Sequence, residues 1–222
     1  MNQNPSIVTT PSSAISTNKV VRNTYMLLSM TLLFSAVTAT MSVLLRMPPM
    51  TYLISIGGAF LLIWMVLPRH ANKASGLAVV FAITGLLGFS LGPILSMYLA
   101  LANGPQTVAV ALGGTGIIFM GLSGYALTTR RDFNFLGGFL FTGMLVILMA
   151  ALANIFLAIP AVSLTISAAI IMIMSGFILY DTSRMINGGE TNYVMATVGL
   201  YLSIFNIFIS LLQILGIAGN DD

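Results

Sequence analysis

The sequence has no cysteine, a single histidine, and only eight Lys or Arg and five Asp or Glu among 222 residues. The lack of cysteine excludes disulfides, thiolate metal sites and cysteine nucleophiles. One histidine, His70, cannot form the histidine cluster of a metal-dependent hydrolase, so no metal or other cofactor is predicted. A charged fraction of 6%, against roughly 25% in soluble domains, excludes a water-soluble fold. The scattered basic residues also form no stripe for nucleic acid.

Long apolar runs dominate the chain, which is 58% hydrophobic and has a mean hydropathy of +1.02. Each run approaches the roughly 20 residues that a helix needs to cross a bilayer. We therefore predict an all-α polytopic membrane protein with seven transmembrane helices, in contact with the lipid bilayer throughout. The predicted spans are Thr24–Leu45, Thr51–Leu67, Leu77–Leu101, Thr107–Leu127, Phe135–Ile159, Ala161 to Tyr180 or beyond, and Val194–Gly216.

The division between the fifth and sixth spans depends on Pro160, because the apolar stretch from Phe135 to Tyr180 is almost uninterrupted. Proline suits a helix start and disfavours helix before it. The positions of the charges support this break, since short cytoplasmic loops collect Lys and Arg. With seven spans, seven basic residues fall on one side and Arg46 alone on the other. The seven are Lys19, Arg22, Arg69, Lys73, Arg130, Arg131 and Arg184.

This split predicts a cytoplasmic amino terminus and an external carboxyl terminus. Residues 1–18 are rich in Ser, Thr, Asn and Pro and carry no charged side chain, which predicts a disordered cytoplasmic tail. Residues 19–222 then form one seven-helix transmembrane domain. Glycines are frequent in the third to fifth spans, and we expect most of them to pack helices together within the chain.

Two patterns in the sequence resemble those of intramembrane enzymes, but each lacks a group that the chemistry needs. The tetrapeptide Gly121-Leu-Ser-Gly124 resembles the serine motif of rhomboid-type proteases, but His70 precedes it and lies in a loop. An aspartyl protease needs two carboxylates that share a site, and Asp181 is the only acid within a predicted span. An enzyme is therefore not predicted.

Asp181 is the main candidate site residue, since an ionisable group at mid-bilayer costs about 2.5–3.5 kcal/mol on insertion scales. In one interpretation it pairs with Arg184 on the same helix face and anchors the helix near the interface. In the other, Asp181 lines a cavity and acts as a proton-sensitive gate. The sequence leaves both interpretations open.

Several segments resemble the Bax inhibitor-1 family, a family of seven-span proteins, from about Ser16 to Gly216. The strongest are Gly176-Phe-Ile-Leu-Tyr-Asp181-Thr-Ser-Arg-Met, Gly188-Gly-Glu-Thr-Asn-Tyr193 and Leu200-Tyr-Leu-Ser-Ile-Phe-Asn-Ile-Phe208. The shorter segments are Arg22-Asn-Thr-Tyr25, Ala111-Leu-Gly-Gly-Thr115, Leu127-Thr-Thr-Arg130, Phe135-Leu-Gly-Gly138 and Ala153-Asn-Ile-Phe-Leu157.

The resemblance implies two kinds of activity in the bacterial inner membrane. A proteobacterial member of the family, which the shorter segments resemble, is a partner and substrate of FtsH, the membrane-anchored ATP-dependent protease, and modulates it. Other bacterial members are pH-sensitive calcium leaks with an aspartate on each of the last two helices. Asp181 matches the first aspartate, but Ser203 stands where the second would be. Two coupled carboxylates share a proton in a way that one cannot.

The predicted function is therefore that of an inner-membrane regulator that binds FtsH and modulates its proteolysis of membrane proteins. A tail of about 18 residues is also what a processive protease needs to begin on a substrate. The alternative is a pH-sensitive calcium or cation leak, in which Ca²⁺ or H⁺ is the permeant or sensed ion. Its predicted gate consists of Asp181, Arg184 and Ser203.

Overall fold

The computed structural model describes residues 11–218, and all regular elements within this range are helices. They are α1 (Pro11–Leu44), α2 (Met50–Leu61), the π-helical segment η1 (Leu62–Val66), α3 (Leu67–His70), α4 (Ser75–Leu99), α5 (Gly104–Thr129), α6 (Leu136–Leu157), α7 (Pro160–Ile186) and α8 (Tyr193–Ala218). Within the described range, seven helices are long and apolar enough to cross a membrane, with α2, η1 and α3 joined as one. These overlap the seven predicted spans, so the predicted fold class is confirmed.

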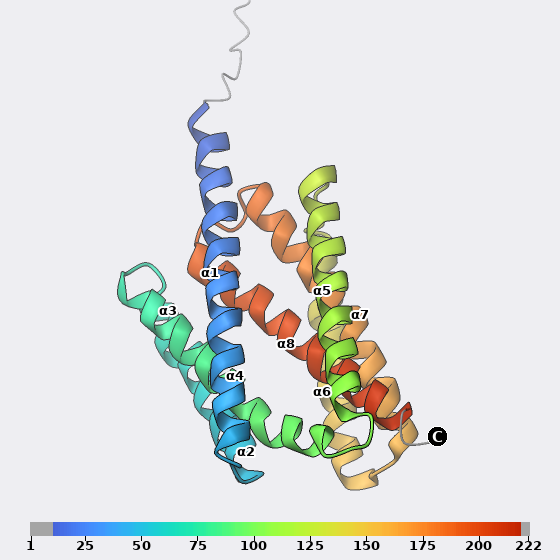
Figure 1. The fold of residues 1–222 in the computed structure, drawn as a ribbon. Helices are drawn as coiled ribbons and strands as arrows, with labels where there is room; N and C mark the ends of the chain where they lie inside the picture. The colour runs from blue at the N-terminus through green and yellow to red at the C-terminus, as the bar shows by residue number, and fades with distance from the viewer. Residues whose placement is uncertain (1–10, 219–222) are drawn as a thin grey trace, which may run out of the picture.

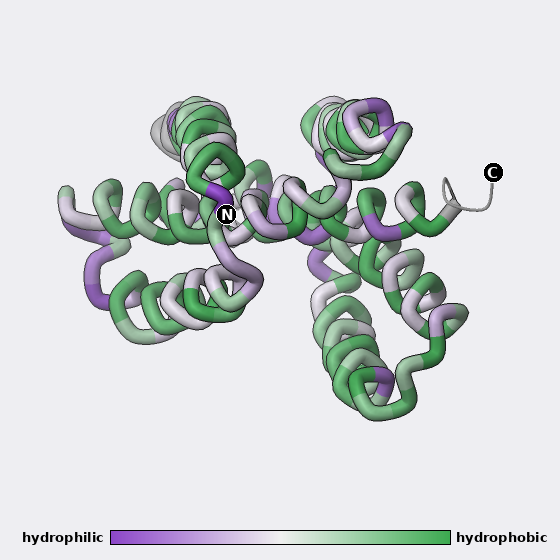
Figure 2. The backbone as a smooth tube through the Cα atoms, turned by 60° about the horizontal axis from the view of Figure 1, so that its bottom comes forward, coloured by the Kyte–Doolittle hydropathy of each residue, from purple (hydrophilic) through white to green (hydrophobic). Residues whose placement is uncertain are grey.

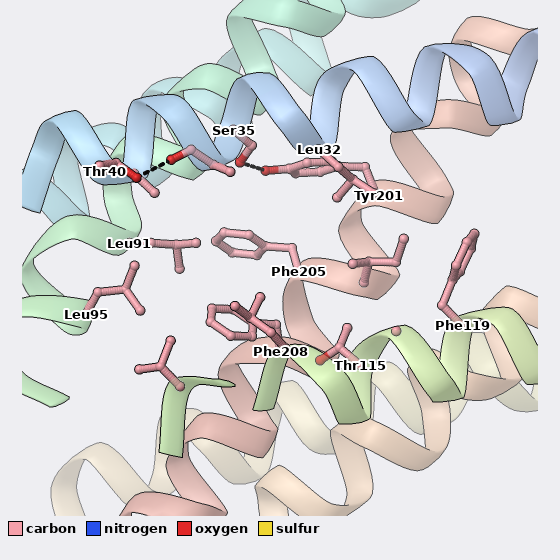
Figure 3. Close-up of a pocket in the computed structure, with 16 residues that line it drawn as sticks. Leu32, Ser35, Thr40, Leu91, Leu95, Thr115, Phe119, Tyr201, Phe205 and Phe208 are labelled. Atoms are coloured by element: carbon pink, nitrogen blue, oxygen red, sulfur yellow. Dashed lines mark hydrogen bonds between the residues drawn. The ribbon is translucent and has the colours of Figure 1, made fainter. Parts of the chain in front are cut away.

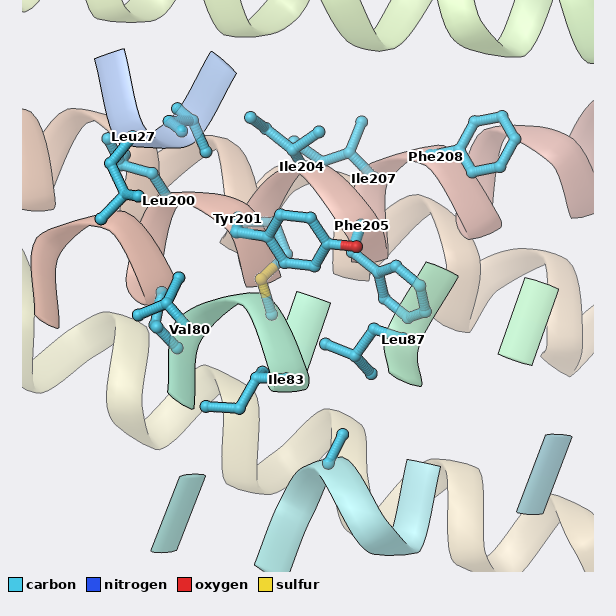
Figure 4. Packing of buried hydrophobic residues seen from close by; sticks show 14 of the residues in the cluster. Leu27, Val80, Ile83, Leu87, Leu200, Tyr201, Ile204, Phe205, Ile207 and Phe208 are labelled. Atoms are coloured by element: carbon cyan, nitrogen blue, oxygen red, sulfur yellow. The ribbon is translucent and has the colours of Figure 1, made fainter. Parts of the chain in front are cut away.

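Helix α8 lies at the centre of the bundle and packs against α1, α4, α5 and α7. Helices α1, α2 and α4 lie together on one side of it, and α5, α6 and α7 on the other (Figures 1 and 2). Leu200 and Ile207 of α8 are fully buried and belong to the same apolar core as Val80 and Ile83 of α4 (Figure 4). In the most apolar window of α8, 56% of the residues are buried, against 11% in α6. The bundle is thus built around its last helix.

The predicted break at Pro160 is confirmed. Ala158 adopts a left-handed conformation (φ 50°), Ile159 is extended, and Pro160 begins α7. The side chain of Asn154 holds this corner, since its Oδ1 accepts from the Ile159 N–H at 3.2 Å and its Nδ2 donates to Ser163 Oγ at 2.7 Å. Proline at the first helical position removes a donor that would have no helical partner. The backbone N–H of Ile159, which lies outside both helices, therefore has its hydrogen-bond partner in the Asn154 side chain.

The basic residues gather at one end of the bundle. Successive helices run in alternating directions, which brings the start of α1, the α3–α4 and α5–α6 connections and the α7–α8 connection together (Figure 1). We call this the basic end, and it carries Lys19, Arg22, Arg69, Lys73, Arg130, Arg131 and Arg184. Arg46 lies at the opposite end, between α1 and α2. The seven-to-one split is thus seen in the fold, and the cytoplasmic location of the basic end stays a prediction.

The predicted tail and the carboxyl terminus fall largely outside the described residues. Helix α1 begins at Pro11, inside the range 1–18 predicted as tail, while residues 1–10 are not described. The terminal residues Asp221 and Asp222 are not described either. The tail and the external position of the carboxyl terminus remain predictions.

Glycines allow α1 and α4 to approach closely, as predicted for the small residues of this span. A Cβ atom added at Gly88 would collide with the backbone oxygen of Ser35, and one at Gly92 would collide with Ser42. The glycines of α5 behave differently, because a Cβ at Gly113 or Gly116 would have no heavy atom of a neighbouring segment within 4 Å. Packing within the chain therefore explains Gly88 and Gly92 of α4 but not Gly113 or Gly116 of α5.

A Gly88→Ala substitution should force the α1 and α4 backbones apart. Because the obstacle is a backbone atom, we expect the free energy of unfolding to fall by about 1–3 kcal/mol, as for other overpacked positions. Gly113→Ala is the matched control, since its methyl group enters open space. Unfolding in mixed micelles followed by far-UV circular dichroism measures both. Equal stability of the two variants would contradict the proposed close approach.

Candidate functional site

Asp181 lies within α7, five residues before its end at Ile186, at the interface with α8. Its carboxylate faces Gly199 of α8, where an added Cβ would lie 2.9 Å from Asp181 Oδ2. The absence of a side chain at Gly199 is therefore what makes room for the acid between the two helices. Among the described residues, Asp181 forms no salt bridge, and no hydrogen bond to its side chain is found.

Ser203 is one helical turn further along α8 and is 2% exposed. Its hydroxyl donates to the backbone oxygen of Gly199 at 3.2 Å, within its own helix. Asp181 and Ser203 thus both lie against Gly199, and in the part of the chain that the structure describes no hydrogen bond joins them.

Arg184 contacts the α7–α8 connection and forms no salt bridge with Asp181. Its guanidinium donates to the backbone oxygen of Gly189 at 3.0 Å and lies 3.7 Å from Glu190 Oε2. It also lies over the Tyr180 ring, 5.5 Å from the ring centre. The ion-pair partner of Arg184 is therefore Glu190 and not Asp181, which leaves the carboxylate without the anchor that one interpretation gave it.

A cluster of hydroxyl groups lies beside Asp181 and joins three helices. Tyr25 of α1 is hydrogen-bonded to Ser123 of α5, and the Oγ1 atom of Thr182 lies 3.4 Å from the Tyr25 hydroxyl and 3.3 Å from Ser123 Oγ. From the sequence, Ser123 was weighed as a nucleophile and then assigned to the packing of small residues, with no hydroxyl cluster predicted. Its partners are hydroxyl groups, which cannot replace the missing histidine base.

The loops at the basic end are tied to the segment that follows Asp181. Ser183 Oγ accepts from the Phe133 N–H at 2.9 Å and donates to the Arg131 oxygen at 3.1 Å, holding the α5–α6 connection. Asn192 Nδ2 donates to the Ala71 oxygen at 3.1 Å, holding the α3–α4 connection. These contacts were not predicted from the sequence. The only signal for them was that the polar residues Thr182 and Ser183 directly follow Asp181.

A second set of buried hydrogen bonds lies where α1, α4 and α8 meet. The Tyr201 hydroxyl is 2.5 Å from Ser35 Oγ and donates to the backbone oxygen of Thr84 at 3.3 Å. All three residues are buried. For residues 11–218, no three His, Asp or Glu side chains gather as a metal site.

The contact between Asp181 and Gly199 is testable by a double-mutant cycle. Gly199→Ala should push the carboxylate aside and lower the free energy of unfolding by about 1 kcal/mol, the low end for overpacked positions, because the obstacle is the end of a side chain. In an Asp181→Ala background the same substitution should cost less, since the obstacle is gone, with a coupling of at least about 0.5 kcal/mol. Gly138→Ala on α6, with open space around it, is the control. Equal costs of Gly199→Ala in both backgrounds would show that the carboxylate does not face this glycine.

The comparisons with known proteins cover nearly the whole chain. It is 52% identical over 209 residues to the "Modulator of FtsH protease YccA" of Escherichia coli K12, which is 94% of each chain. The same identity and coverage hold for the "Inner membrane protein YccA" of Escherichia coli O6:H1. An "Uncharacterized membrane protein" of Vibrio cholerae is 47% identical over 94% of this chain and 93% of its own. With the seven spans, these names confirm the predicted location, a multi-pass protein of the bacterial inner membrane.

The family model described as "Inhibitor of apoptosis-promoting Bax1" matches residues 17–220, which include all the residues of the candidate site. The two E. coli relatives carry the names of a modulator and a membrane protein, not of an enzyme. On the strength of the match over residues 17–220, this chain belongs to the Bax inhibitor-1 family.

Proposed function

We propose that this protein binds the membrane protease FtsH and modulates its proteolysis of membrane proteins. The observation that carries the proposal is the 52% identity to the E. coli modulator of FtsH across 94% of both chains. Because the similarity covers 94% of the chain, we expect the surface that contacts the protease to be the same in this protein and in the E. coli modulator.

The exposed helix surfaces are compatible with contact inside the membrane. Helix α6 is the least buried span, and its Phe139, Phe141 and Phe156 are exposed. Such a face can pack against the membrane helices of another protein. Since the chain has no cysteine, a single cysteine at Phe141 can serve as a unique crosslinking position for mapping this contact.

The proposed role of the tail is to give the protease a starting point. Deleting residues 1–10 removes only the segment before α1. We expect the shortened protein to copurify with FtsH but to survive longer in cells, because a processive protease needs an unfolded end. Pulse–chase labelling measures the lifetime.

A variant in which residues 1–10 are replaced by a Gly–Ser segment of equal length is the control, and it should restore the short lifetime. An unchanged lifetime after deletion would remove the tail from the proposal. Failure of the intact protein to copurify with FtsH would overturn the proposed function itself.

A second candidate function is the cation pathway gated at Asp181. The observation that favours it is the position of this acid inside a span, against Gly199 and with Arg184 engaged by Glu190. A carboxylate without an ion pair is free to bind a cation or a proton, and intramembrane acids of this kind often mark ion pathways. Ser203 offers a hydroxyl but no second charge.

Calcium flux in liposomes tests this pathway. If Asp181 gates it, Asp181→Asn should abolish the difference in flux between acid and neutral pH, since the amide does not titrate. Ser203→Asp adds a carboxylate one turn from Gly199 and should make the pH dependence steeper, because coupled acids share protons. Equal flux through wild type and Asp181→Asn at both pH values would reject the gate.

A further inference from the structure

Helices α1 and α5 stand apart on the same face of α8 and leave a cleft of about 490 Å³ between them. Figure 2 shows the two helices on one side of the bundle, and Figure 3 shows the cleft from close by. Tyr201, Phe205 and Phe208 of α8 contribute to its lining (Figure 3). The walls come from α1, α4 and α5, among them Leu91 and Leu95.

The opening of the cleft lies within the membrane-spanning part of the helices. Ala36 and Thr40 of α1 and Leu112 of α5 line it and are exposed. Each belongs to a span, so the medium at this opening is lipid.

The polar groups along the cleft are already satisfied within the protein. Thr40 Oγ1 donates to the Ala36 oxygen at 2.8 Å, Thr115 Oγ1 donates to the Ala111 oxygen at 2.7 Å, and Tyr201 bonds Ser35. A water molecule in a cavity needs two to four polar partners, and an apolar cavity stays dry. The lining therefore suits hydrocarbon better than water.

A second, separate hollow lies toward the end of the bundle opposite the basic end. It is lined by Val43 of α1, by Arg46 and by Ser96 and Leu99 of α4. Val43 lies one turn after Thr40 on the same face of α1, so the two hollows are neighbours along this helix. Arg46 follows just beyond the end of α1 at Leu44. Ala36 lies eight residues before the end of α1 at Leu44, about 12 Å along the helix and less than half of the roughly 30 Å hydrocarbon core, and Arg46 follows two residues later.

Arg46 supplies charge at this end of the bundle. It is exposed, and the connections 45–49, 100–103 and 158–159, all described, contain no other charged residue. An arginine guanidinium binds phosphate oxygens through strong charge-assisted hydrogen bonds. No carboxylate in these connections competes with a phosphate group for it.

From this arrangement we propose that the cleft between α1 and α5 binds one acyl chain of an anionic phospholipid whose phosphate group lies at Arg46. The acyl chain lies against Phe205 and Phe208 and covers the apolar floor of the cleft. The site joins the two groups of helices on either side of α8 and uses none of the residues around Asp181.

Photocrosslinking of the full chain in nanodiscs tests this site. The probe is phosphatidylglycerol with a diazirine in the middle of one acyl chain. Labelled peptides are expected to come from the cleft-lining parts of α1, α5 and α8. Ala36→Phe should strongly reduce this labelling by filling the cleft. Arg46→Gln should reduce retention of the lipid about fivefold, the contribution of one basic residue near an anionic surface.

Two matched controls separate the site from the general lipid surface. Ala153→Phe places the same side chain at an exposed position of α6, and Arg69→Gln removes a charge at the basic end. Both should label like wild type, and the melting temperatures of all variants show that each is folded. Labelling spread evenly over all spans, or unchanged by Ala36→Phe, would overturn the proposal. Loss of lipid with Arg69→Gln to the same extent as with Arg46→Gln would overturn it too.

Discussion

Hydrocarbon offers no hydrogen-bond partners, and this constraint governs how the polar side chains of the seven spans are used. The hydroxyls of Thr84, Thr115 and Ser203 each donate to the carbonyl one turn earlier in their own helix, at 3.0, 2.7 and 3.2 Å. Asn206 does the same through its amide at 2.8 Å. Side chains that carry their own donor can therefore lie deep in the bundle without water.

Asp181 departs from this pattern, as do the buried hydroxyls of Thr24 and Ser42, which have no hydrogen-bond partner among the described residues. An ionised carboxylate has no donor to give to a helix carbonyl, so its own helix cannot satisfy it. The neighbouring hydroxyls are engaged elsewhere, Thr182 close to Tyr25 and Ser123, and Ser183 with Phe133 and Arg131. A proton on Asp181 would supply the missing donor. The contact between α7 and α8 therefore holds a carboxylate for which no hydrogen bond is found among the described residues.

The sequence predicted the features that depend on hydropathy and chain direction, and these agree with the structure. The seven spans, the break at Pro160 and the separation of Arg46 from the other basic residues belong to this class. The candidate site was predicted only as a set of residues. That Arg184 meets Glu190 depends on the course of the α7–α8 connection, which leaves Glu190 within its reach.

Which helices pack against one another could not be predicted from the sequence either, for a physical reason. Small residues permit close approach but do not specify which helix approaches, since all spans are similarly apolar. Gly88 meets Ser35 of α1, while Gly113 of α5, in a similar sequence context, meets no other segment. The cluster of Tyr25, Ser123 and Thr182 likewise depends on the three-dimensional arrangement of α1, α5 and α7.

Helix α1 connects the proposed activities, because it carries the tail, contacts near Asp181 and one wall of the cleft. A protease that pulls from the amino-terminal side has to extract α1 first. This helix is held by the close approach at Gly88 and by the bonds of Tyr25 and Ser35 to α5 and α8. Extraction of α1 requires all of these contacts with α4, α5 and α8 to break. Under the proposed function, slow extraction of α1 keeps the protease occupied and lowers its action on other membrane proteins.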